Sequence, residues 1–187
     1  DLADLEAGFI FDVVYASDDN FMGEALYDIP LCLAHEDLAR ALIDAQKHAR
    51  ELGLGLIIYD AYRPVSAQIK MRDLAPEGQK HFVATVQNAN HPRGAAVDCS
   101  LADESGEPLA MPSGFDELTE RAAVNYAGGT DEERANRDLL IKIMHEAGLR
   151  VAAGEWWHFA LEGAGRYESM DFSFEEFMAG RDSDETD

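Results

Sequence analysis

The sequence contains little cysteine and no long apolar run, and each shortage excludes a class of protein. Cys32 and Cys99 are its two cysteines, and without a Cys-x-x-Cys pair a cysteine-based zinc knuckle or redox motif is excluded. The two residues either form one disulfide in an oxidising compartment or remain as buried thiols in the cytosol. No apolar stretch reaches the ~18 residues that suggest a membrane helix, so we expect no membrane span.

Basic residues are also scarce, and the protein is strongly acidic. It carries 15 Lys and Arg residues against 37 Asp and Glu residues, which gives a formal net charge of -22 at pH 7. Such a surface repels nucleic-acid phosphates and anionic membranes, so we exclude nucleic acid and membranes as partners. The charge is consistent with high solubility or a salty habitat.

The length and composition predict one folded domain. The chain has 187 residues, of which 47% are hydrophobic, and this is long enough to bury a substantial core. We expect the domain to cover residues 1–180 and residues 181–187 to form an acidic tail.

Hydrophobic periodicity predicts an α+β fold, in which a central antiparallel sheet has helices packed mainly on one side. Apolar residues at three- and four-residue spacing predict helices at 35–52 and 131–147, and Thr130 with Glu133 forms a capping-box pattern at the start of the second. Shorter helices are expected at 65–74, 77–86 and 171–180. Strands are expected at 54–59, 95–101, 149–152 and 157–161.

Two short segments carry residues that bind metals. His91 and Asp98 lie seven residues apart among small residues, and Glu155 and His158 lie about sixty residues downstream. Two His, one Asp and a spare Glu suit a catalytic zinc site, which has three protein ligands and one open position. A straight strand would place His91 and Asp98 on opposite faces. The turn predicted by Pro92 and the glycine after Arg93 allows both to reach one metal.

The roles of the neighbouring residues are open at this point. Glu155 is either a third ligand or a base that takes a proton from water. The tryptophans 156 and 157 either belong to the core or exclude water from the site, which would raise the pKa of Glu155. Arg63 is either an ion-pair partner for Asp60 or a fixed cation that stabilises an oxyanion. The other four histidines are read as surface or structural groups.

Four segments together resemble a known family, the D-alanyl-D-alanine dipeptidases of the vancomycin-resistance (VanX) type. These zinc peptidases are related to bacterial D,D-carboxypeptidases and L,D-endopeptidases. The segments span most of the chain, in the order and spacing of the family. They are residues 15–23 (YASDDNFMG), 59–64 (YDAYRP), 91–98 (HPRGAAVD) and 155–158 (EWWH).

The resemblance implies a chemistry for five residues. It implies that His91, Asp98 and His158 hold one zinc ion per chain and that Glu155 is the general base. It further implies that Arg63 polarises the scissile carbonyl and stabilises the oxyanion.

The resemblance also implies two substrate-binding residues. Tyr15 is similar to a tyrosine that lines the substrate pocket, and Asp116 is similar to the aspartate that receives the free ammonium of the substrate. A buried carboxylate can bind an ammonium group through a charge-assisted hydrogen bond. The sequence departs from the family at residues 88–90 (NAN), where a Ser is expected shortly before the metal-binding His.

The predicted function is therefore zinc-dependent hydrolysis of D-alanyl-D-alanine or a close D,D-dipeptide. One alternative is a D,D-carboxypeptidase or endopeptidase that acts on longer peptidoglycan stem peptides, which the presence of Tyr15 and Asp116 disfavours. Another is a non-catalytic, zinc-stabilised module that binds cell-wall peptides, which an intact Glu155 and Arg63 disfavour. The oligomeric state is open.

The expected location is periplasmic or exported, with the cytoplasm as the alternative. The chain begins without Met, and a Cys32–Cys99 bridge would tie the first long helix to the metal-binding strand and suit an exported enzyme.

Overall fold

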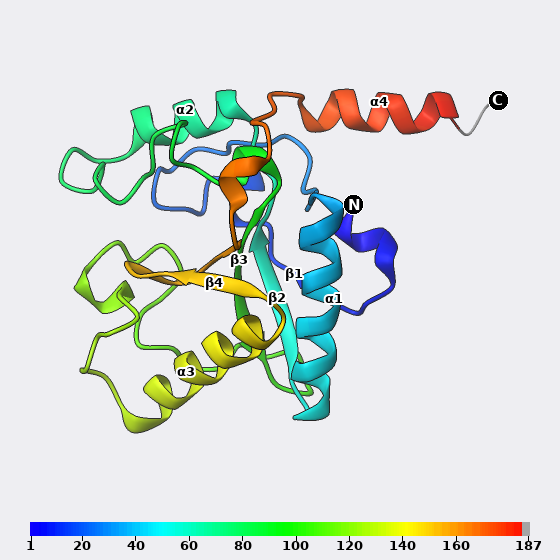
Figure 1. Cartoon of the computed structure of the whole chain (residues 1–187). Coiled ribbons are helices and arrows are strands. Elements are labelled where there is room, and N and C mark those ends of the chain that lie inside the picture. Colours follow the sequence, from blue (N-terminus) through cyan, green and yellow to red (C-terminus); the bar gives the residue numbers. More distant parts are fainter. Residues whose placement is uncertain (185–187) are drawn as a thin grey trace.

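A computed structural model describes residues 1–184 of the chain (Figure 1). The helices are α1 (Glu36–Glu51), α2 (Val65–Leu74), α3 (Asp131–Glu146) and α4 (Phe174–Asp184). The strands are β1 (Ile10–Phe11), β2 (Gly55–Asp60), β3 (Ala96–Ala102), β4 (Leu149–Ala152) and β5 (Glu155–Leu161). No helix in the described part of the chain is long and apolar enough to cross a membrane.

The strands form one five-stranded sheet in the order β1-β2-β3-β5-β4. The pairs β2–β3, β3–β5 and β4–β5 are antiparallel, which confirms the predicted α+β fold. The edge pair differs, because the two-residue strand β1 runs parallel to β2. The sheet is therefore mixed, and the amino-terminal arm supplies its outer edge.

Helices α1 and α3 pack together against one face of the sheet, while α2 and α4 lie near one end of it (Figure 1). Alternate residues of β3, namely Val97, Cys99 and Leu101, join a core that also contains Leu42 of α1 and Leu140 of α3. Burying a side chain such as Leu contributes roughly 1.5–3 kcal/mol. Because side chains alternate along a strand, Asp98 points to the opposite face of the sheet.

Capping interactions define the ends of the helices. The predicted capping box is confirmed at α3, where the Glu133 amide donates to Thr130 Oγ1 (3.1 Å) and the Thr130 amide donates to Glu133 Oε2 (2.6 Å). Ser173 and Glu176 make the same pair of bonds at the start of α4, which is why this helix begins later than the predicted residue 171.

The remaining predictions of secondary structure are confirmed with one exception. The helices at 35–52 and 65–74 and the four expected strands are present. Residues 77–86 form turns instead of the expected helix, because Pro76 and Gly78 favour turns and few apolar residues there face the core. Helix α4 runs to Asp184, and residues 185–187 of the expected acidic tail lie outside the described residues.

The two cysteines are free, buried thiols, so of the two alternatives left open by the sequence the buried thiols are confirmed and the Cys32–Cys99 bridge is wrong. Both side chains lie in the main hydrophobic core, at 3% and 0% exposure. A free cysteine in such a setting packs as a small apolar group. Export of the protein stays a prediction, without the support that a disulfide would give it.

Candidate active site

The structure brings His91, Asp98 and His158 together on the face of the sheet opposite α1 and α3. Asp98 of β3 and His158 of β5 are direct partners in the antiparallel ladder, so their side chains project from adjacent positions. His91 lies in the 3-10 turn before β3, which ends at Gly94 in a left-handed conformation (φ 59°). A Cβ on Gly94 would lie 3.0 Å from the His35 backbone nitrogen, so glycine suits both the conformation and the space.

The donor atoms of these three residues have the spacing of a zinc site. His91 Nε2 lies 3.2 Å from His158 Nδ1 and 3.3 Å from Asp98 Oδ2, and His158 Nδ1 lies 2.9 Å from Asp98 Oδ1. Ligands bound at ~2.0–2.1 Å to a tetrahedral zinc ion are separated by about 3.3 Å. Two imidazoles and one carboxylate, already at this separation, therefore fit a zinc ion.

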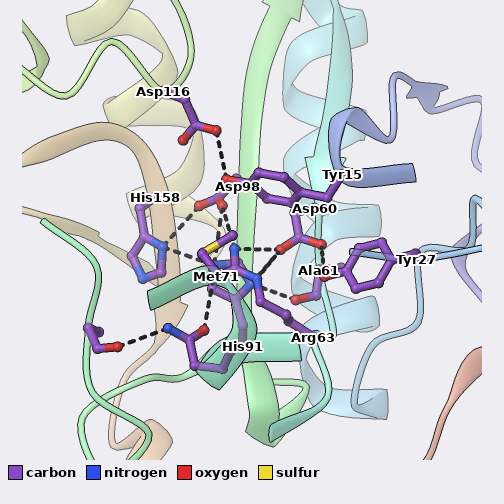
Figure 2. A network of polar contacts seen from close by, with 12 residues as sticks. Tyr15, Tyr27, Asp60, Ala61, Arg63, Met71, His91, Asp98, Asp116 and His158 are labelled. Carbon is purple, nitrogen blue, oxygen red and sulfur yellow. Dashed lines mark hydrogen bonds and ion pairs between the residues drawn. The ribbon is translucent and has the colours of Figure 1, made fainter. Parts of the chain in front are cut away.

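A hydrogen bond to the backbone determines which nitrogen of His91 is available to a metal. Its Nδ1 lies 2.5 Å from the carbonyl oxygen of Ala61, and a carbonyl oxygen only accepts hydrogen bonds. Nδ1 therefore carries the proton, and Nε2 presents its lone pair toward His158 and Asp98 (Figure 2). A hydrogen bond of this kind is typical of histidines that bind metals.

Asp98 and His158 shift each other's pKa. Burial alone would raise the pKa of Asp98, but the facing imidazoles of His91 and His158 hold it well below its ordinary value. Burial works to lower the pKa of His158, yet the hydrogen bond and charge of Asp98 outweigh this effect and raise it. A carboxylate that stays ionised between two imidazoles suits the binding of a cation.

Glu155 stands at the start of β5, beside a register shift between Val151 and Ala152 of β4. Burial raises its pKa, while the positive charges of His158 and Arg63 lower it only in part. Within residues 1–184 its side chain makes no hydrogen bond or ion pair. An uncommitted carboxyl group with a raised pKa, next to three metal-competent side chains, can act as a general base.

Arg63 is both an ion-pair partner of Asp60 and a cation directed at the site. Its Nε and Nη2 donate to Asp60 Oδ2 at 3.0 and 2.7 Å. Its Nη2 also lies 3.6 Å from Asp98 Oδ2. The side chain is 6% exposed and lines the same pocket as the metal-competent residues. The ion pair with Asp60 is therefore confirmed and leaves the guanidinium at the pocket, while its role in stabilising an oxyanion stays a prediction.

Tyr15 and Asp116 meet across 101 residues of sequence, where Tyr15 Oη donates to Asp116 Oδ2 at 2.8 Å. Tyr15 lies in a 3-10 turn just after β1, and its ring lies 5.1 Å from the Arg63 guanidinium carbon. Asp116 adopts a left-handed backbone (φ 57°), which is uncommon for a residue other than glycine. Burial raises the pKa of Asp116 to about 8, because the hydrogen bond from Tyr15 and the charge of Arg63 offset the desolvation only in part.

One pocket of about 290 Å³ contains all seven of these residues. Its lining includes the metal-competent cluster, Glu155 and Arg63, and it also includes Tyr15 and Asp116. Part of the wall comes from residues 82–84 and 88–90, in the loop that follows α2. A small molecule in this pocket would contact the metal-competent cluster and the buried carboxyl of Asp116 at once.

Comparison with known proteins identifies the family. Residues 1–178 match the Peptidase_M15 family, described as D-ala-D-ala dipeptidase. The chain belongs to this family. A D-alanyl-D-alanine dipeptidase of Escherichia coli is 37% identical over 96% of this chain and 92% of its own length. A second, from Enterococcus faecalis, is 32% identical over 84% of this chain and 93% of its own length.

The similarity of the chain to solved structures is weaker than its similarity to these two relatives. A vancomycin-resistance D,D-pentapeptidase aligns with a TM-score of 0.43 and 16% identity, over 68% of this chain and 72% of its own. This similarity is too low to support a functional argument.

Some residues that contact Arg63 were not among the site residues predicted from the sequence. Asp60 was expected only as a possible partner of Arg63, yet it also accepts a hydrogen bond from Tyr27 Oη (3.0 Å). Gln68 and Met71 of α2 contact the Arg63 guanidinium. The signal for the last two is a helix that begins directly after Arg63-Pro64, because residues in its first two turns lie close to the arginine.

Proposed function

We propose that this protein hydrolyses D-alanyl-D-alanine, or a close D,D-dipeptide, with zinc as its cofactor. The observation that carries the proposal is that one pocket contains both the His-Asp-His cluster and the buried carboxyl of Asp116. The cluster suits peptide-bond hydrolysis, and the carboxyl suits the free amino group that a dipeptide presents. The family of the chain and the names of its relatives support the same activity.

In this proposal one zinc ion is held by His91, Asp98 and His158. When bound, zinc supplies Lewis-acid chemistry, which lowers the pKa of a water molecule and polarises a carbonyl oxygen. The protein keeps the ligands ready for the ion, because the Ala61 carbonyl orients His91 and the strand pairing orients Asp98 and His158.

Glu155 moves the proton. Its raised pKa brings the carboxyl closer to neutral pH, where it can accept a proton from the attacking water and later give it to the leaving amine. Trp157 lines the pocket beside it and is 1% exposed, so it helps to keep bulk water away from this proton transfer.

Arg63 stabilises the negative charge that develops on the carbonyl oxygen of the substrate. The guanidinium is fixed by Asp60 before any substrate arrives, and such preorganised donors lower the barrier to acyl transfer.

Tyr15 and Asp116 select the amino end of the substrate. In the free protein Asp116 has one neutral donor, Tyr15, and its pKa is raised to about 8. A substrate ammonium would provide the missing opposite charge and bring that pKa down. A substrate whose amino group is blocked would leave this carboxyl buried without a partner, which is unfavourable.

The deciding experiment compares two substrates with the zinc-loaded protein. We expect release of D-alanine from D-Ala-D-Ala and none from N-acetyl-D-Ala-D-Ala. The Asp116→Asn variant should lose about 10- to 150-fold in kcat/KM on the free dipeptide, which corresponds to a hydrogen bond between charged groups worth ~1.5–3 kcal/mol. Cleavage of both substrates would instead indicate a carboxypeptidase, and cleavage of neither, with zinc bound, a binding module.

A further inference from the structure

Gln68 connects Arg63 to the pocket wall. It lies on α2, is 2% exposed, and makes two hydrogen bonds from its side chain. Its Oε1 accepts from Arg63 Nη1 at 2.8 Å, and its Nε2 donates to the carbonyl oxygen of Ala84 at 2.9 Å. Arginine can only donate and a carbonyl can only accept, so the orientation of the amide is determined by its partners.

The contacts of Arg63 show which part of the guanidinium is available to a substrate. Nε and Nη2 both donate to the carboxylate of Asp60. Nη1 donates to Gln68 and, at 3.0 Å, to the sulfur of Met71 (Figure 2). A thioether is a weak acceptor, so the hydrogen of Nη1 that faces Met71 is one of two that a substrate oxygen can easily take over. The other is the second hydrogen of Nη2, whose nitrogen lies 3.6 Å from Asp98 Oδ2.

We propose that Gln68 is a positioning residue for the hydrolysis, an inference that rests on the proposed function of Arg63. Gln68 holds Nη1 of Arg63 so that its weakly bonded hydrogen points into the pocket. Through Ala84 it also ties this nitrogen to the wall formed by residues 82–84. The guanidinium is thus held from two sides, by Asp60 and by Gln68.

The side chain of glutamine suits this role better than its close relatives. Glutamate lacks the donor that meets the Ala84 carbonyl, and methionine lacks both polar groups. Asparagine has both but is one methylene shorter, so it cannot span the same two partners. Each substitution therefore removes the hydrogen bond to Arg63 Nη1, the hydrogen bond to the Ala84 carbonyl, or both. The bonds between Arg63 and Asp60 stay in place.

A second buried glutamine provides a matched control. Gln46 of α1 is also 2% exposed, and its Oε1 accepts from the Leu56 amide (2.8 Å) while its Nε2 donates to the Gly8 carbonyl (2.9 Å). It has the same number of bonds and the same burial as Gln68, but it does not line the pocket of Arg63. A purely structural role for Gln68 predicts equal consequences at both positions.

The test compares Gln68→Met with Gln46→Met in the zinc-loaded, full-length protein. We expect both variants to lower the midpoint of thermal unfolding by a similar amount. Only Gln68→Met should lower kcat for D-Ala-D-Ala, by about 10- to 100-fold, with KM changed less than about threefold, because small displacements of a catalytic group affect the transition state most. Equal kcat in the two variants would overturn the inference.

A double-mutant cycle tests whether Gln68 acts through Arg63. Arg63→Met should lower kcat strongly, and adding Gln68→Met should then cost less than about twofold more, since the group being positioned is gone. Full additivity would overturn the inference. An Arg63→Met variant with unchanged kcat would instead refute the proposed function of Arg63.

The nuclear magnetic resonance spectrum of the Arg63 guanidinium gives a readout that is independent of turnover. Nη1 presents one hydrogen to Gln68 and the other to Met71, so we expect two separate hydrogen signals from Nη1 in the parent protein and in Gln46→Met. In Gln68→Met we expect one averaged signal, because rotation about the Cζ–Nη1 bond leaves the bonds to Asp60 intact. Separate signals in Gln68→Met would overturn the inference. Where Gln68→Met does not fold, Gln68→Asn, with Gln46→Asn as its control, undergoes the same measurements with the same expected outcomes.

Discussion

Asp98 of β3 and His158 of β5 face each other across the antiparallel ladder, and their side chains meet at 2.9 Å. Cross-strand neighbours of this kind are held by the hydrogen bonds of the sheet rather than by a loop. Two of the three proposed zinc ligands thus belong to the most regular part of the fold. His91 comes from a turn, and the hydrogen bond to Ala61 restricts its ring.

Replacing Glu155 should separate metal binding from catalysis. Because Glu155 is proposed to move a proton and not to bind zinc, Glu155→Ala should retain full zinc while kcat falls about 100- to 10,000-fold. Metal content by mass spectrometry and turnover of D-Ala-D-Ala are measured on the same sample. Unchanged turnover would remove Glu155 as the base, and loss of zinc would make it a ligand.

Replacing His158 should have the opposite result. His158→Ala removes one of three ligands, so we expect loss of zinc together with activity. His145→Ala is the matched control, because His145 is exposed on α3 and belongs to no metal-competent cluster in the described residues. Full metal occupancy of His158→Ala in native mass spectrometry would refute the proposed ligand set.

The buried carboxyl of Asp116 should make stability depend on pH. Its folded pKa of about 8 lies above the ordinary value of 3.8, so the folded state holds this proton more tightly than the unfolded state. The resulting stabilisation is present in full below pH ~4 and is lost as the pH rises toward ~8. Asp116→Asn cannot titrate, so its stability relative to the parent should increase across this range.

The measurement is the thermal midpoint of each protein, without substrate, at several pH values between 4 and 9. A difference between parent and Asp116→Asn that stays constant with pH would contradict the raised pKa. A substrate analogue with a free amino group should reduce the difference, because its ammonium favours the ionised carboxylate.

The free thiols predict that reducing agents do not change stability. With Cys32 and Cys99 unbridged, the thermal midpoint should be the same with and without dithiothreitol. Alkylation of the unreduced protein after denaturation should label two thiols per chain. Labelling of none, with a lower midpoint under reduction, would show a disulfide in solution.

Local patterns predicted much of the fold, and distant contacts explain what they missed. The alternation of Val97, Cys99 and Leu101 predicted β3, and Thr130 with Glu133 predicted the start of α3, because strand faces and caps depend on nearby residues. The parallel pairing of β1 with β2 was not predicted, since the partner of a short edge strand is set by contacts that are distant in the sequence. The helix expected at 77–86 was wrong for a different reason, as a short pattern without a core-facing side is weak evidence.

In the site, too, local motifs were predicted from the sequence, whereas contacts between distant segments were not. Motif spacing brought attention to His91, Asp98, Glu155 and His158, and the structure does bring them into one pocket. The role proposed for Gln68 had no counterpart in the sequence analysis, because it depends on the carbonyl of Ala84, 16 residues away. Backbone groups carry no sequence signature, so bonds to them appear only in the folded chain.

The arrangement of β1 and the Tyr15 turn has a consequence for how this enzyme family can diversify. Of the residues proposed for chemistry, Asp98, Glu155 and His158 lie on central strands, and His91 and Arg63 lie in the short segments next to β3 and β2. Tyr15 and Asp116 lie instead on an edge arm and a loop. Edge segments and loops tolerate insertions and replacements that central strands do not. The choice of substrate length can therefore change in evolution, or be changed by grafting, while the hydrolytic centre is inherited intact.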